Sequence, residues 1–226
     1  MQPPLSRRTF LSAAAAAAAG CARQDAPARP NLLLLMSDQQ HWQALGSVDP
    51  FFETPNLDAL ARDGVRFSHA FCTTPQCSPS RSSLFTGDYP SRTGVFGNVG
   101  ALGGAPLRQP TLGKYLQDAG YRTGYFGKWH LGEEQQAIAG WTEEDRKAAD
   151  PEVTRKGIEF LERNASADAP FALVLSWLDP HDIYDFRKEW HESASPTAPL
   201  PESWERADLA SKPAPQQQFM TDDQGT

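Results

Sequence analysis

Cysteine is scarce in this chain, and runs of basic residues are absent. The 226 residues include only three cysteines, Cys21, Cys72 and Cys77, which argues against a disulfide framework, so stability has to come from burial of apolar side chains. The formal net charge is −7, and without a basic run no nucleic-acid partner is expected. No internal repeat is visible. An anionic substrate would have to be attracted by a local cluster of charges and a metal.

Residues 1–20 are predicted to be an export signal rather than part of the fold. Arg7 and Arg8 precede an alanine-rich run, a pattern typical of signals that the twin-arginine translocase reads. The Ala-Ala-Gly-Cys sequence that follows is similar to a bacterial lipobox, which would make Cys21 a lipidated first residue, with residues 21–30 as a polar tether. The expected location is the periplasm, with a lipid anchor in the outer membrane as the sole membrane contact. The alternative is an uncleaved alanine-rich helix.

Short apolar runs alternate with helix-like segments further along the chain. Strands are expected over residues 31–36, 121–126 and 171–178, helices over residues 54–63, 111–119 and 151–163, and a further helix that begins at Cys77. The first strand is predicted to be buried on both faces, and Ile158 and Leu161 are predicted to share the buried face of the last helix. The alternation indicates an α/β fold with a mostly parallel sheet and helices on both faces. In such sheets ligands bind at the carboxyl ends of the strands.

Residues 77–87 bring a thiol, a helix start and a guanidinium close together. Their sequence is Cys-Ser-Pro-Ser-Arg-Ser-Ser-Leu-Phe-Thr-Gly. Pro79 suits the first turn of a helix, so Cys77 is expected at the helix N-terminus, where backbone N–H groups and the helix dipole favour an anion. Arg81 follows four residues later, on the same helical face. The segment therefore predicts a pocket for a negatively charged group, with a buried structural cysteine as the alternative.

Two motifs in this chain resemble the signatures of one enzyme family. The segment 77–87 resembles the sulfatase signature C-x-P-x-R followed by T-G, in which the cysteine is oxidised after translation to formylglycine. Residues 120–132, Gly-Tyr-Arg-Thr-Gly-Tyr-Phe-Gly-Lys-Trp-His-Leu-Gly, resemble the second signature, G-Y-x-T-x-x-x-G-K-W-H-x-G. Two long motifs in the right order are more specific than one. The resemblance covers residues 31 to about 205 and implies the alkaline-phosphatase-like α/β sandwich.

The resemblance also implies roles for individual residues. Formylglycine at Cys77 would be hydrated to a geminal diol, and one hydroxyl, made more acidic by a metal, would attack sulfur. The second hydroxyl would then lose its proton, so that sulfate leaves and the aldehyde is restored. Arg81 would hold the diol, and Lys128 and His130 would bind sulfate oxygens and the diol. His181 would stabilise or protonate the leaving oxygen.

The expected metal site is incomplete. Asp38 follows the first predicted strand, matches a family metal ligand and suits Ca²⁺, with Mg²⁺ or Mn²⁺ as alternatives. Gln39 stands where the family often has a second aspartate, and the diol at Cys77 would add a further ligand. The family's remaining ligands come from a strand far downstream, and no such stretch precedes Thr226. Residues 31–226 are therefore expected to be the N-terminal part of an apparently truncated sulfatase domain, without turnover of its own. Asn98 is either a pocket donor or a turn residue.

Three functions are consistent with these residues. The leading hypothesis is a sulfuric ester hydrolase that acts on a sulfated small molecule or glycan and is matured by a formylglycine-generating enzyme. Gln39 favours, as an alternative, a phosphonate or phosphate ester hydrolase of the same superfamily. The third hypothesis is a truncated, catalytically inactive lipoprotein that at most binds anions.

Overall fold

The computed structural model describes residues 29–100, 103–133, 136–181 and 209–218. The chain divides into two units, Met1–Gln40 with Phe67–Asp182, and His41–Arg66 with Ile183–Thr226. Among the described residues, no helix is both long and apolar enough to span a bilayer. The predicted export signal and Cys21 lie outside the described residues, so their assignment stays a prediction.

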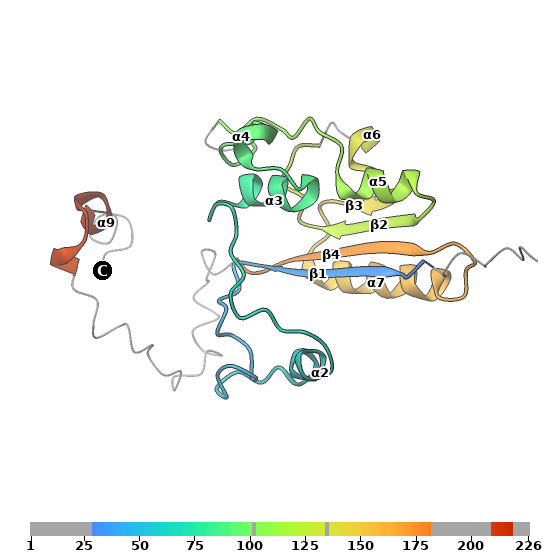
Figure 1. Cartoon of the computed structure of the whole chain (residues 1–226), viewed down its shortest axis with the longest axis horizontal. Coiled ribbons are helices and arrows are strands. Elements are labelled where there is room, and N and C mark those ends of the chain that lie inside the picture. Colours follow the sequence, from blue (N-terminus) through green and yellow to red (C-terminus); the bar gives the residue numbers. More distant parts are fainter. Residues whose placement is uncertain (1–28, 101–102, 134–135, 182–208, 219–226) are drawn as a thin grey trace, which may run out of the picture. The chain divides into compact units, whose positions relative to one another are not determined.

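A four-stranded parallel sheet forms the centre of the first unit (Figure 1). The strands are β1 (Leu32–Asp38), β2 (Arg122–Gly127), β3 (Glu143–Asp145) and β4 (Phe171–Pro180), in the spatial order β1-β4-β2-β3. All three neighbouring pairs are parallel, so β1, β2 and β4 end at the same edge of the sheet. The predicted α/β class and the parallel sheet are confirmed.

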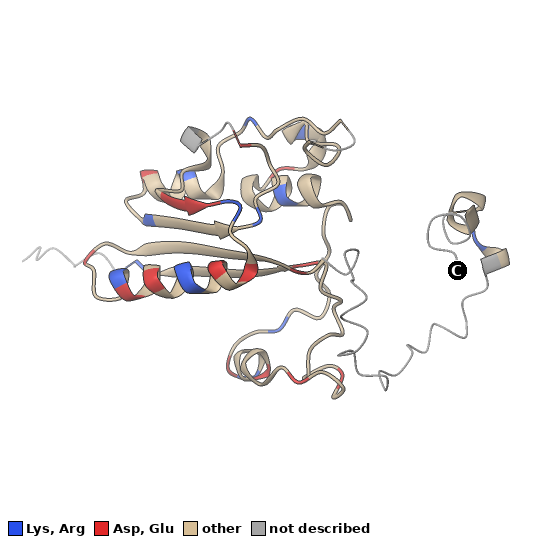
Figure 2. Cartoon of the chain, turned by 180° about the vertical axis from the view of Figure 1, so that it is seen from behind, with Lys and Arg blue, Asp and Glu red and all other residues tan. Residues whose placement is uncertain are grey.

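Helices cover both faces of this sheet. They are α3 (Cys77–Thr86), α4 (Pro90–Thr93), α5 (Leu112–Asp118), α6 (Gln136–Ala139) and α7 (Asp150–Asn164). Figure 1 shows α3, α4, α5 and α6 on one side of the sheet and α7 on the other. Acidic and basic residues alternate along α7 (Figure 2), and Arg155 pairs there with Glu152 and Glu159. α7 is thus amphipathic, with a charged outer face.

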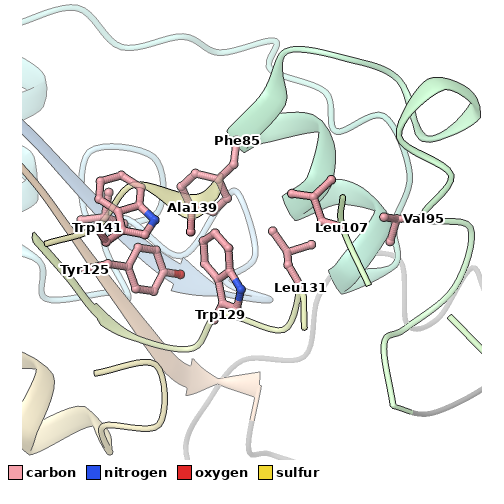
Figure 3. Packing of buried hydrophobic residues seen from close by; sticks show 9 residues of the cluster. Phe85, Val95, Leu107, Tyr125, Trp129, Leu131, Ala139 and Trp141 are labelled. Carbon is pink, nitrogen blue, oxygen red and sulfur yellow. The ribbon is translucent and has the colours of Figure 1, made fainter. Parts of the chain in front are cut away.

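Aromatic side chains fix α3 over the end of β2. Phe85 of α3 lies 5.8 Å from Tyr125 and 5.4 Å from Trp129 between ring centroids. Figure 3 shows these rings in one cluster with Trp141. Because Phe85 is almost fully buried and is the penultimate residue of α3, this packing holds the C-terminal end of the helix against β2. The helix that begins at Cys77 therefore lies beside the sheet.

The prediction that β1 is buried on both faces is wrong for the structure described. Leu32, Leu33 and Leu35 are 40%, 49% and 48% exposed. Within the described sheet β1 is an edge strand and pairs with β4 alone, so one side of it has no neighbouring strand. A leucine run by itself does not distinguish an edge strand from a central one.

The prediction that Ile158 lies on the buried face of its helix is also wrong. Ile158 is 52% exposed, whereas α7 buries Val153, Gly157, Phe160 and Asn164. A Cβ atom on Gly157 would lie 2.5 Å from Cδ1 of Leu175, so the missing side chain lets the helix approach the sheet. Glycine carries little hydrophobic signal, which is why the pattern pointed to the wrong face.

The second unit contains α2 (Pro55–Asp63), the short 3₁₀ helix η2 (Leu209–Ser211) and α9 (Ala214–Gln218). α2 confirms the helix predicted over residues 54–63. Thr54 precedes it, and its hydroxyl accepts a hydrogen bond from the Gly46 amide and donates one to Asp58. The predicted site residues from Asp38 to His181 all lie in the first unit.

Candidate active site

Polar residues from four segments meet at the carboxyl edge of the sheet. Asp38 ends β1, Cys77 begins α3, Lys128 follows β2 and His181 follows β4. Donor atoms of Asp38, Cys77 and His181 all lie within 4.8 Å of one another. Nζ of Lys128 lies 3.8 Å from Sγ of Cys77. The structure thus brings together four residues that the sequence predicted for one site.

Hydrogen bonds tie the N-terminus of α3 to two loops. Oδ1 of Asn98 accepts a hydrogen bond of 3.0 Å from the Ser78 amide, next to Cys77. The Ser78 hydroxyl donates to the His130 carbonyl at 2.6 Å and accepts from the Val99 amide at 3.0 Å. Asn98 therefore positions the helix start through its oxygen, and its role as a pocket donor stays a prediction. Sequence analysis missed Ser78, although it lies inside the first signature.

Arg81 is buried, and both terminal nitrogens of its guanidinium donate hydrogen bonds to groups around the site. Nη1 donates to the Lys128 carbonyl at 2.7 Å, to Oγ of Ser176 at 3.1 Å and to the Tyr125 hydroxyl at 3.4 Å. Nη2 donates to Oδ2 of Asp38 at 3.3 Å. Sequence analysis missed Tyr125 and Ser176. Each of these residues places a polar group within a strand whose other residues are mostly apolar or glycine, and that pattern could have identified them.

The Asp38 carboxylate lies between two cations. Lys128 and Arg81 both form ion pairs with Oδ2 of Asp38, whose side chain is 11% exposed. Burial raises the pKa of Asp38, but the hydrogen bond and charge of Lys128 and the charges of Arg81 and His181 outweigh it, so the pKa lies below its usual value. Asp38 is therefore ionised at neutral pH. Two cations for one carboxylate leave positive charge that suits an anionic ligand.

His130 presents a ring nitrogen that has no partner. Among the residues that the structure describes, the buried Nδ1 of His130 forms no hydrogen bond. Burial lowers the pKa of His130, and the charges of Lys128 and Arg81 lower it further, so the ring is neutral at physiological pH. Its backbone adopts the left-handed region with φ of 59°. A neutral imidazole with an unpaired nitrogen is suited to a hydrogen bond with a ligand.

The donors at this edge fit one side of a hard divalent cation's coordination shell. In the described part of the chain, the one group of acidic, histidine or cysteine side chains placed to hold a metal is Asp38, Cys77 and His181. Sγ of Cys77 marks the place where formylglycine would present oxygen. Ca²⁺ prefers about six to eight oxygen ligands, and Asp38 with an oxygen at residue 77 supplies part of such a set. Gln39 follows directly, with φ of 62°, and its role as a ligand stays a prediction.

The comparison with known families agrees with this geometry. The family model described as Sulfatase matches residues 30–206. The chain belongs to the sulfatase family. This match confirms the family that both signatures predicted, and it spans the strands and helices that carry the site.

Known sulfatases with similar sequences or structures are longer than this chain. The ulvan-active sulfatase of Formosa agariphila is 34% identical over 193 residues, which cover 70% of this chain and 37% of that protein. The solved structure of BT4656, in complex with its substrate D-glucosamine-2-N,6-O-disulfate, has a TM-score of 0.59 and 29% identity, covering 68% of this chain and 35% of that one. BT1596, a 2-O GAG sulfatase, has a TM-score of 0.66 at 24% identity, covering 85% and 45%. The sulfatase-family chain thus spans less than half the length of each.

Proposed function

We propose that this sulfatase-family chain supplies the nucleophile and the anion-binding residues for sulfate-ester hydrolysis, with formylglycine made from Cys77 as the nucleophile. The observation that supports this function most is the position of Cys77, at a helix N-terminus within reach of Lys128, Asp38 and His181. A sulfate placed there meets a cation, backbone N–H groups and an imidazole. Sulfated glycans are the proposed substrate class, since BT4656 was solved with a sulfated sugar.

The proposed reaction uses both hydroxyls of hydrated formylglycine at residue 77. One hydroxyl loses its proton to water and its oxygen attacks sulfur while the bond between sulfur and the alcohol oxygen breaks, and protonated His181 gives the leaving oxygen a proton. The second hydroxyl then gives its proton to His181, its oxygen forms the aldehyde double bond, and the bond between the carbon and the sulfated oxygen breaks, so that sulfate departs. Lys128 neutralises charge on the sulfate, and Nδ1 of His130 is available to hold the diol. A divalent cation held by Asp38 and residue 77 would supply further charge neutralisation.

Conversion of Cys77 is the first expected result. When the chain is expressed with a formylglycine-generating enzyme, tandem mass spectrometry of the peptide over residues 67–81 should show an aldehyde in place of the thiol at Cys77. Cys72 lies in the same peptide, outside the signature, and should remain a thiol. An unmodified Cys77 alongside a converted control substrate of the same enzyme would contradict the proposed nucleophile.

Gln39 gives a specific reason to test a second reaction, hydrolysis of a phosphonate or phosphate ester. A neutral amide in place of a second carboxylate leaves the cluster of Lys128, Arg81 and Asp38 more positive, which suits the dianion of a phosphate monoester, because a sulfate ester and a phosphonate monoester each carry one negative charge. The two functions can be separated by titrating the converted protein with sodium sulfate and with phenylphosphonate in a calorimeter. Tighter binding of sulfate supports the sulfatase. Tighter binding of phenylphosphonate supports the alternative, and binding of neither contradicts both.

Export by the twin-arginine route is also a proposal, supported by the Arg7-Arg8 pair. Replacing both residues by lysine keeps the charge but removes the receptor-read pair. We expect the double variant to stay in the cytoplasm, whereas the unchanged chain reaches the periplasm, as measured by cell fractionation and immunoblotting. Unchanged export of the double variant would show that the chain uses another route.

A further inference from the structure

Arg146 is held beside the active site but has no part in the proposed reaction. It follows β3 directly, and its side chain is only 10% exposed. Its Nε donates to Oε2 of Glu144 at 2.7 Å and its Nη1 to the Gly132 carbonyl at 3.4 Å. The guanidinium carbon lies 4.8 Å from the centre of the Trp129 ring. These contacts fix the guanidinium in one orientation.

The remaining nitrogen of this guanidinium, Nη2, has no acceptor. Across the described ranges, from residue 29 to residue 218 with their gaps, this buried nitrogen forms no hydrogen bond. Native structures rarely leave a buried charged donor unpaired, because the lost hydration is not replaced. An acceptor brought by a ligand would remove that penalty. The planar guanidinium of Arg146 suits the oxygens of a carboxylate or a sulfate in particular.

Arg146 lines a cavity that begins at the proposed catalytic residues. The cavity measures about 960 Å³, and Lys128 and His130 form part of its wall. The segment 146–151 and the end of β4 form another part. Since Nζ of Lys128 lies 3.8 Å from Sγ of Cys77, a ligand whose sulfate lies at Cys77 can extend into this cavity. Figure 2 shows the basic residues that follow the acidic strand β3.

Two of the acidic residues in the cavity wall already have partners. Asp150 accepts hydrogen bonds from the amides of Leu178 at 2.7 Å and Asp179 at 2.9 Å. Glu133 pairs with Lys147 at 2.7 Å, and both side chains are more than 70% exposed. These two carboxylates therefore do not compete for Nη2 of Arg146. Arg146 pairs with Glu144 through Nε alone, and its Nη2 is left to bind an anion from outside the chain.

We propose that Arg146 binds a second anionic group, a sulfate ester or a carboxylate, on the same molecule whose sulfate lies at Cys77. The inference rests on the proposed function, because Cys77 defines where the scissile sulfate lies. It narrows the substrate class to saccharides that carry at least two negative charges. Arg146 is thus a specificity residue, and it takes no part in bond breaking.

The test compares singly and doubly charged sugars by calorimetry. The first pair is N-acetylglucosamine 6-sulfate, whose acetylated amine carries no charge, and glucosamine 2-N,6-O-disulfate. The second pair is N-acetylgalactosamine 6-sulfate and its disaccharide with a uronic acid, which adds a carboxylate instead of a sulfate. We expect the unchanged chain to bind a doubly charged member about tenfold more tightly, the effect of one hydrogen bond between charged groups. A preference in the first pair indicates that Arg146 binds a sulfate, and a preference in the second pair indicates that it binds a carboxylate.

Four variants at three residues separate this role from the proposed function. Arg146→Gln should remove the preference and leave the affinity for the singly charged sugars unchanged, whereas Arg146→Lys should keep part of it. Arg163→Gln is the matched control, since Arg163 also pairs with a glutamate of β3, Glu143, but is 54% exposed and does not line the cavity. Lys128→Ala should weaken binding of every sugar, because it removes the cation beside Cys77.

The outcomes distinguish failure of the second anion site from failure of the proposed function. Equal binding of both members of each pair, unchanged by Arg146→Gln, would overturn the second anion site and leave the proposed function standing. Binding of no sugar by the unchanged chain would overturn both. If Arg146→Gln does not fold, the double variant Glu144→Gln with Arg146→Gln removes both charges together. Retention of the preference in that folded variant would also overturn the inference.

Discussion

Replacing Arg81 by methionine should destabilise the chain by about 3 kcal/mol, the effect of removing one partner from a buried ion pair. Methionine fills much of the same space but donates no hydrogen bond. The Lys128 carbonyl and the Ser176 hydroxyl would each lose a buried donor, and the Asp38 carboxylate would keep Lys128 as its remaining cation. Urea unfolding followed by tryptophan fluorescence measures the loss.

The second part of this prediction concerns anion binding. Without Arg81 the segment at Lys128 loses one of its hydrogen bonds to α3, so the affinity for sodium sulfate should fall by about tenfold or more. Arg62→Met is the control, since Arg62 is exposed and pairs with its neighbour Asp63, and such a pair contributes about 0–1 kcal/mol. Equal stability of both variants would show that the buried network does not hold the site together.

The residues proposed to take part in the reaction could be predicted from the sequence, whereas most of the residues that hold them in place could not. Cys77, Lys128 and His181 were predicted to act together, and the structure places them within one cluster with Asp38. These residues lie at the end of a strand or the start of a helix, where polar side chains are also common as turn and capping residues. Motif spacing identifies such residues because the chemistry requires particular side chains.

The supporting residues could not be predicted in the same way. Ser176 contacts Arg81 across 95 positions of sequence, and Arg146 stacks on Trp129 from another loop. Each contact depends on strand order, because β4 has to lie between β1 and β2 before Ser176 can meet Arg81. A single sequence gives the strands but not their order. For the same reason the exposed edge position of β1 was missed.

Strand order also explains why the site lies where it does. β1, β4 and β2 are neighbours and run in the same direction, so Asp38, His181 and Lys128 follow strands that end together. The helix dipole of α3 points at the same edge through Cys77. Carboxylate, imidazole, ammonium and thiol are therefore brought together by sheet topology, and their hydrogen bonds refine the arrangement.

Gly127 provides the tightest backbone contact next to the site, and Gly127→Ala should lower the free energy of unfolding by about 3 kcal/mol or more. A Cβ atom on this residue would lie 2.0 Å from the Ser176 carbonyl oxygen, and its φ is 106°. The next amide, that of Lys128, donates to the same carbonyl at 2.9 Å. A side chain here would force β2 away from β4 and would strain the backbone as well, each costing about 1–3 kcal/mol.

The matched control for this prediction is Gly87→Ala. Gly87 also has a positive φ, 76°, but a Cβ atom there would meet no atom within 4 Å. Its replacement should therefore cost only the left-handed conformation, about 1–2 kcal/mol. Both variants can be compared by urea unfolding, with sulfate affinity as the second measurement, because displacement of Lys128 should weaken anion binding in Gly127→Ala alone. If the two variants lost the same stability and kept the same sulfate affinity, the close approach of β2 to Ser176 would not be what requires glycine, and Lys128 would be positioned by its side-chain contacts instead.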